Sequence, residues 1–130
     1  MTDSATPPGK RFEQGQAMLE QVHPVSAPHV LSSLAGIAPD FGRFLVEFAY
    51  GDIYARPALA PKDRQIAIIA ALTAMGNAAP ELKMHIEAGL NVGLSKEQIV
   101  EVIMQMAVYA GFPVALNGLA VAKEVFDGRV

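Results

Sequence analysis

Apolar side chains recur at helical spacing along the chain, and proline and glycine residues separate the segments that carry this pattern. Proline is tolerated in the first turn of a helix, so Pro28 and Pro39 mark helix starts. Proline also disfavours the α conformation in the residue before it, so Pro24 and Pro57 end the helices that precede them. The N-terminal part therefore contains three predicted helices, which span residues 10–22, 28–36 and 39–56.

The C-terminal part carries clearer helix signals. Gly76 follows an apolar segment as a C-cap would, and Ser95 with Gln98 has the pattern of a capping box. The run 65–75 is apolar on nearly every side, which is typical of a helix in the centre of a bundle or at an interface. The predicted helices span residues 61–75, 80–93, 95–108 and 113–127. Because no segment alternates with period two, we predict an all-α bundle of about six helices in one domain, residues 10–130, after a disordered tail, residues 1–9.

Composition narrows the classes of protein that fit this pattern. The chain contains no cysteine, which excludes disulfides, thiol nucleophiles and cysteine-ligated metals and is compatible with the reducing cytoplasm, where we expect the protein. The net charge is −3 without a basic cluster, so nucleic acid is not an expected partner. No signal peptide and no membrane-spanning segment is predicted. The apolar content of 52% exceeds what a chain of 130 residues buries alone, so we expect a homo-oligomer.

One pair of residues suggests acid–base chemistry. Glu81 precedes His85 by four residues in a predicted helix, and residues at this spacing share a helix face. Histidine is the side chain best matched to proton transfer near neutral pH, and a neighbouring carboxylate would orient it. The alternative is structural, because a glutamate near a helix N-terminus stabilises the helix dipole wherever it occurs.

Other polar residues have both a functional and a structural interpretation. A guanidinium engages a carboxylate through two hydrogen bonds, which makes Arg56 and Arg64 candidates for binding an anionic substrate. Arg56 could equally bind the carbonyls of a helix end, and Arg64 could pair with a neighbouring carboxylate. Tyr109 either offers its hydroxyl to a substrate or packs its ring at the edge of the bundle. His23 and His29 lie far from the third histidine and lack the spacing of a helical metal pair, so no metal site is predicted.

Three blocks of the sequence resemble the gamma-carboxymuconolactone decarboxylase family, which includes alkylhydroperoxidase-D-like proteins. The first block is Phe48–Pro57 followed by Leu59 and Arg64, and the second is Glu81–His85 followed by Asn91–Leu94. The third consists of Glu97, Ile99 and Glu101–Val102 followed by Tyr109–Pro113. The resemblance implies a helical fold, an active site on a central helical hairpin and a homotrimer or homohexamer. In the lactone decarboxylase branch it implies conversion of 4-carboxymuconolactone to 3-oxoadipate enol-lactone and carbon dioxide without a metal or organic cofactor. His85, oriented by Glu81, would then return a proton to carbon.

The chain departs from the pattern of its relatives at several positions. The peroxidase branch needs a Cys-x-x-Cys-x-x-x-His motif, but Ala78 and Glu81 stand at the cysteine positions, so thiol peroxidase chemistry is not expected. Gln65 stands where relatives often have glutamate, and Gln105, a candidate substrate-binding residue, stands where lactone decarboxylases commonly have histidine. These amides favour the alternative of a non-catalytic oligomer that binds a small anionic metabolite, whereas the Glu81/His85 pair favours the enzyme.

Overall fold

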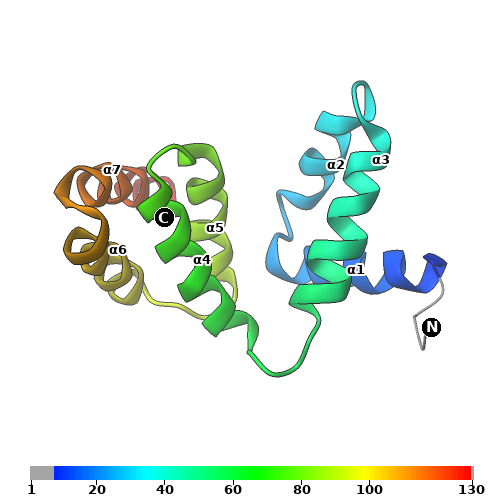
Figure 1. Ribbon diagram of the computed structural model, residues 1–130, viewed down its shortest axis with the longest axis horizontal. Coiled ribbons are helices and arrows are strands. Elements are labelled where there is room, and N and C mark those ends of the chain that lie inside the picture. The colour runs from blue at the N-terminus through cyan, green and yellow to red at the C-terminus, as the bar shows by residue number, and fades with distance from the viewer. Residues whose placement is uncertain (1–7, 130) are drawn as a thin grey trace. The chain divides into compact units, whose positions relative to one another are not determined.

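The computed structural model describes residues 8–129, and every regular element in that range is a helix, which confirms the predicted all-α class (Figure 1). The chain divides into two compact units, Met1–Leu59 and Ala60–Val130. No helix within residues 8–129 is long and apolar enough to cross a membrane. The elements in chain order are α1 (Pro8–Val22), α2 (Ala27–Ala35), α3 (Pro39–Phe44), η1 (Leu45–Tyr54), α4 (Pro61–Met75), α5 (Ala79–Asn91), α6 (Lys96–Ala110) and α7 (Phe112–Gly128).

Most helix boundaries lie within two residues of their predicted positions. Gly76 adopts φ 76°, the left-handed conformation that a helix C-cap favours, directly after α4. The capping box before α6 is complete, because the Ser95 hydroxyl accepts from the Gln98 backbone N–H and the Gln98 amide oxygen accepts from the Ser95 N–H. Of the predicted tail, residues 1–7 lie outside the described range, whereas Pro8 and Gly9 belong to the first turn of α1.

The helix predicted from Pro39 to Arg56 is not uniform. It is α-helical in α3 and continues as a ten-residue π-helix, η1, in which each hydrogen bond spans five residues instead of four. Val46, Glu47, Tyr50 and Gly51 are buried on η1. Three phenylalanine side chains along α3 and η1 stay largely exposed: Phe41, Phe44 and Phe48 are 60%, 51% and 61% exposed.

In the first unit, α1 crosses η1 at very short range. Gly15 on α1 makes this possible, because a Cβ there would lie 2.0 Å from the carbonyl oxygen of Val46. A Cβ on Gly51 would lie 2.9 Å from the carbonyl oxygen of Arg11. Beside the crossing, the Arg11 guanidinium donates to both carboxylate oxygens of Asp52, at 3.2 Å and 2.7 Å. The crossing thus depends on two glycines and one bidentate ion pair.

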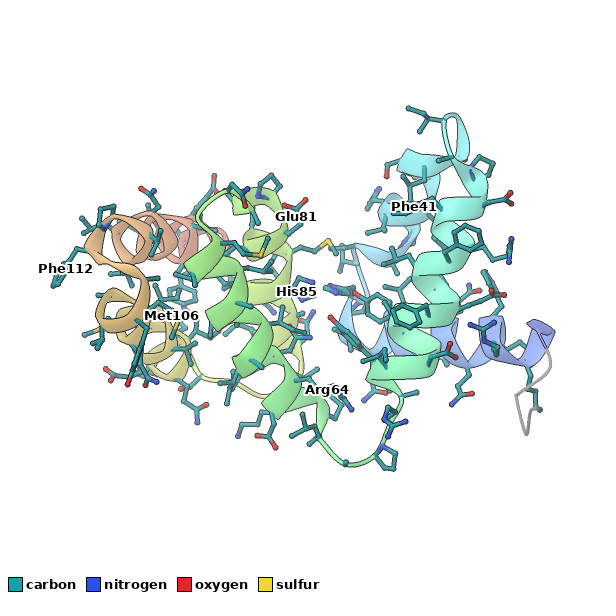
Figure 2. All side chains as sticks on the ribbon, in the orientation of Figure 1. Phe41, Arg64, Glu81, His85, Met106 and Phe112 are labelled. Atoms are coloured by element: carbon teal, nitrogen blue, oxygen red, sulfur yellow. The ribbon has the colours of Figure 1, made fainter. Side chains whose placement is uncertain are left out.

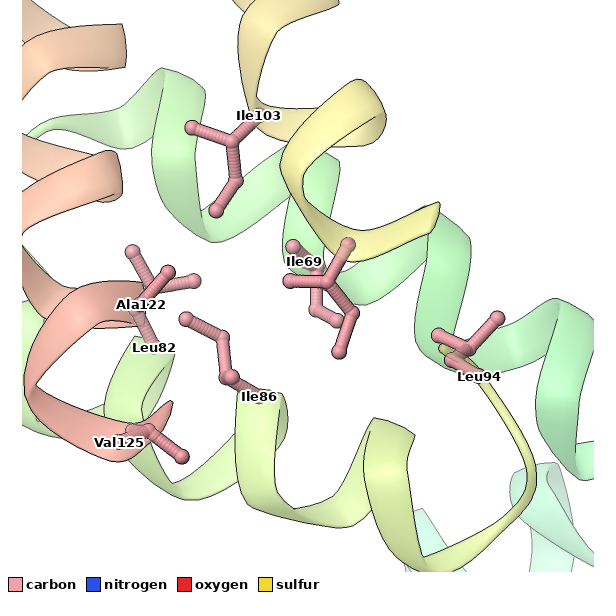
Figure 3. Packing of buried hydrophobic residues seen from close by; sticks show 8 residues of the cluster. Ile69, Leu82, Ile86, Leu94, Ile103, Ala122 and Val125 are labelled. Atoms are coloured by element: carbon pink, nitrogen blue, oxygen red, sulfur yellow. The ribbon is translucent and has the colours of Figure 1, made fainter. Parts of the chain in front are cut away.

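The second unit, whose helices are coloured green to red in Figure 1, is built around one apolar core (Figure 3). α4 packs against α5, α6 and α7, which confirms that its nearly continuous apolar sequence belongs in the centre of a bundle. Its buried positions, Gln65, Ile69 and Thr73, recur every four residues and form one stripe. The core of this unit is formed by Ile69, Leu82, Ile86, Leu94, Ile99, Ile103, Ala122 and Val125.

Candidate active site

The helices α4 and α5 bring one polar pair together at the edge of this core. Gln65 begins the buried stripe of α4, and His85 directly precedes the buried Ile86 on α5. The two helices pack closely, since a Cβ on Gly89 would lie only 3.2 Å from Cδ1 of Ile69. This packing allows a side chain of α4 to hydrogen-bond a side chain of α5 twenty residues further along the chain.

The pair consists of an imidazole and a neutral amide. Nδ1 of His85 lies 3.0 Å from Oε1 of Gln65. An amide oxygen only accepts hydrogen bonds, so Nδ1 carries the hydrogen and donates it to Gln65. In a neutral imidazole the other nitrogen, Nε2, then holds the lone pair and is the atom that gains or loses a proton. The geometry therefore assigns distinct roles to the two ring nitrogens.

Gln65 differs sharply from its partner in exposure. The residue is 0% exposed, and its Nε2 has no hydrogen-bond partner among residues 8–129, whereas His85 is partly exposed. In the sequence, Gln65 was notable only because relatives often have glutamate at this position. The overlooked signal was an amide within an apolar run, four residues before Ile69 and therefore on the same buried face.

Glu81 lies on the same helix as His85, one turn closer to the N-terminus (Figure 2). It is exposed and falls in the first turn of α5, where a carboxylate stabilises the helix dipole. The hydrogen bond described for Nδ1 of His85 goes to Gln65, and a bond between Glu81 and His85 stays a prediction.

The two candidate arginines lie in different units. Arg64 is half-buried on α4, next to Gln65 in the chain, and belongs to the same unit as His85 (Figure 2). Arg56 belongs to the first unit, where it is exposed just after η1, and its backbone N–H donates to the carbonyl of Ile53. A role in anion binding stays a prediction for both.

Gln105 and Tyr109 lie four residues apart on an exposed face of α6. Tyr109 is 79% exposed, so the interpretation that its ring packs into the bundle edge is wrong. The reason is that Ile99 and Ile103 occupy the buried face of the helix, and Tyr109, six residues after Ile103, points about 120° away from that face. Both residues remain candidates for substrate contact.

The other two histidines lie in the first unit. Nε2 of His23 is 3.0 Å from the hydroxyl of Tyr50, and the histidine is 2% exposed. Burial lowers the pKa of the His23 imidazole to about 4, because a charged ring would be poorly solvated there. His29 is exposed. Within the described part of the chain, no group of three or more histidine, aspartate or glutamate residues is placed to hold a metal ion.

Comparison with known proteins gives a consistent result. Residues 39–124 match the model of the Carboxymuconolactone decarboxylase family. The chain is 34% identical over 120 residues to a 4-carboxymuconolactone decarboxylase of Acinetobacter baylyi, covering 90% of this chain and 87% of that protein. It is 27% identical over 123 residues to a nitrosuccinic acid decarboxylase of Metarhizium robertsii, covering 92% of this chain and 83% of that protein.

Proposed function

Because the chain belongs to the carboxymuconolactone decarboxylase family, we propose that it is a carboxy-lyase that removes carbon dioxide from a small organic anion. The observation that carries this proposal is the hydrogen bond between His85 and Gln65, which holds an imidazole in a single orientation on the α4–α5 pair. His85 supplies the proton that a substrate carbon gains after carbon dioxide has left. The reaction is proposed to need no metal or organic cofactor.

The names of the two relatives suggest the class of substrate. 4-Carboxymuconolactone and nitrosuccinic acid are both small acids that carry more than one carboxyl group. When carbon dioxide leaves such a compound, the electron pair of the broken C–C bond spreads onto an adjacent electron-withdrawing group, a conjugated lactone carbonyl in one case and a nitro group in the other. An enzyme for this class must bind an anion, stabilise that charge and protonate one carbon atom.

His85 is suited to the protonation step. In its charged form the imidazole carries hydrogens on both nitrogens, and Nε2 gives its proton to a carbon of the delocalised anion that remains when carbon dioxide leaves. For 4-carboxymuconolactone this is the carbon next to the lactone carbonyl, which leaves the C=C bond at the decarboxylated carbon and so gives the enol-lactone. Nδ1 keeps its hydrogen before and after the transfer, so the bond to Gln65 persists throughout the step. One proton from solvent then restores His85, which balances the reaction. General acid catalysis of this kind contributes roughly 10²–10⁴ to the rate.

The remaining sequence candidates are proposed as supporting groups. Arg64 is the first candidate for binding the substrate carboxylate, because it lies in the same unit as His85 and next to Gln65 in the chain. Glu81 is proposed to help orient His85, and Arg56 is a second candidate for anion binding. Gln105 and Tyr109 are proposed substrate contacts.

We also propose that the protein is a homotrimer or homohexamer. Large apolar side chains remain exposed at the junction of α6 and α7, where Phe112 is 72% and Leu116 61% exposed. They line a hollow of about 270 Å³ whose walls are almost entirely apolar. Exposed apolar surface of this kind supports association between subunits.

The decisive experiment for the catalytic proposal is incubation of the purified protein with 4-carboxymuconolactone, following ultraviolet absorbance and released carbon dioxide. Turnover should fall at least about 100-fold in His85→Ala while helical circular dichroism is retained. His29→Ala, at an exposed histidine of the first unit, is the matched control and should keep full activity. Full activity of His85→Ala would reject the assignment, and binding without turnover by the wild type would favour the non-catalytic alternative.

A further inference from the structure

The amide nitrogen of Gln65 is a feature of the site that the proton-transfer step does not use. Gln65 is fully buried, and its Oε1 is engaged by His85, yet its Nε2 has no hydrogen-bond partner among residues 8–129. A buried donor without a partner destabilises the fold, and an apolar side chain of the same shape would avoid that penalty. A ligand or a water molecule that reaches this nitrogen would supply the missing acceptor.

We propose that Gln65 is a bifunctional residue whose Oε1 fixes the tautomer of His85 and whose Nε2 donates a hydrogen bond to the substrate oxygen that gains negative charge as carbon dioxide leaves. This inference rests on the proposed decarboxylase function. It makes Gln65 a positioning residue toward His85 and a catalytic residue toward the substrate.

The planar shape of the amide links the two roles of Gln65. Oε1 and Nε2 are bonded to the same planar carbon, so the bond from His85 to Oε1 also determines the direction in which the N–H groups of Nε2 point. The proton donor and the charge-stabilising donor are thereby held in one rigid relationship. Preorganised donors of this kind, aimed at developing charge in a site shielded from water, are a major source of catalysis.

A neutral amide offers a hydrogen-bond donor at this position that a carboxylate lacks. A glutamate at position 65 could accept the hydrogen of Nδ1, but it would offer no donor and would place a negative charge beside an anionic substrate. Glutamine keeps the acceptor and adds the donor. The presence of Gln65 is thus compatible with catalysis and does not by itself indicate a protein that only binds.

The tautomer is measured first, on the wild-type protein without ligand. Long-range ¹H–¹⁵N NMR at alkaline pH, where the imidazole is neutral, distinguishes hydrogen on Nδ1 from hydrogen on Nε2. We expect His85 to carry its hydrogen on Nδ1. A spectrum with the hydrogen on Nε2 would mean that the amide is reversed, with Nε2 of Gln65 facing the ring, and would overturn the proposal.

Two substitutions then separate the two roles. Gln65→Glu retains an acceptor for Nδ1 and removes the donor, so the tautomer should persist while kcat for 4-carboxymuconolactone falls roughly 10²- to 10³-fold. Gln65→Met, similar in length and uncharged, removes both groups, so the tautomer preference and kcat should both be lost. Gln14→Glu, at an exposed position on α1, is the matched control and should change neither.

Binding is measured with muconolactone, which lacks the departing carboxyl group and therefore cannot be decarboxylated at that carbon. Its affinity should fall by no more than about tenfold in either variant, because a hydrogen bond to an uncharged carbonyl contributes far less than one to developing charge. If kcat stays within tenfold of wild type in whichever variant retains its circular dichroism, the donor role is wrong. If the wild type neither converts 4-carboxymuconolactone nor binds muconolactone, the decarboxylase proposal is wrong, and the donor role of Gln65 is wrong with it. The tautomer of His85 is tested independently by the NMR spectrum.

Discussion

Replacing Gly15 with alanine tests the packing of the first unit. Helix propensity and the contact between helices have opposite effects on the free energy of unfolding at this position. Gly15 lies in the middle of α1, where alanine is a better helix former by about 1 kcal/mol. Helix propensity alone therefore predicts that Gly15→Ala stabilises the protein. The structure predicts the reverse.

The size of the effect follows from the crossing of α1 and η1. The added Cβ would lie 2.0 Å from the carbonyl oxygen of Val46, whereas such contacts in proteins are practically never shorter than 3.0 Å, so the helices must separate by about 1 Å. The obstacle is backbone and cannot rotate away. Overpacking typically costs 1–3 kcal/mol, and this contact belongs at the upper end. After the gain in helix propensity, the free energy of unfolding should fall by about 2 kcal/mol.

Urea unfolding followed by circular dichroism measures this difference, with all variants at one protein concentration because association would shift the midpoint. With a slope near 2 kcal/mol/M, the midpoint for Gly15→Ala should fall by about 1 M. Gly9→Ala is the matched control, since a Cβ at Gly9 on the same helix meets nothing within 4 Å, and its midpoint should stay level or rise. A rise in both variants would refute the close crossing.

Two further predictions concern stability at low pH and assembly. The pKa of His23 in the folded protein, about 4, lies below the ordinary value of 6.5. Burying the neutral imidazole therefore leaves the free energy of unfolding at its full value above pH 6.5. As the pH falls toward 4, the unfolded chain takes up a proton that the folded protein does not, and the free energy of unfolding decreases by at most ~3 kcal/mol. His23→Gln should flatten the dependence of the urea midpoint on pH across that window, whereas His29→Gln should leave it unchanged; equal pH dependence in both variants would contradict this. Light scattering at micromolar concentration should give a trimeric or hexameric mass for the wild type. Leu116→Glu, which puts a charge on the exposed apolar surface, should give a smaller mass. A monomeric mass for the wild type would exclude the proposed oligomer.

The helices and the family could be predicted because their signals are local. Helix starts and ends depend on proline, glycine and capping residues that act within a few positions, as at Gly76 and Ser95. The family could be predicted from three ordered blocks, and both the family match over residues 39–124 and the 34% identity to a named relative confirm it.

The parts that could not be predicted depend on contacts between helices or on backbone hydrogen bonding. The sequence placed Gln65 in a buried helix but carried no information that its amide would face His85 on the next helix. It suggested Glu81 instead, because spacing within one helix is the only proximity that a single sequence displays. The π-helical form of η1 was equally hidden, since the spacing of Phe41, Phe44 and Phe48 fits an ordinary α-helix.

The π-helix makes the first unit sensitive to the number of its residues rather than to their chemistry. Deleting one residue from a helix rotates every following side chain about the helix axis. A deletion at any single position between Val46 and Tyr50 would therefore turn the tyrosine hydroxyl away from His23 and move Gly51 off the α1 crossing. Substitutions at the exposed positions of η1 leave that alignment intact. Related chains should therefore vary freely in the outward-facing residues of this segment while keeping its length constant.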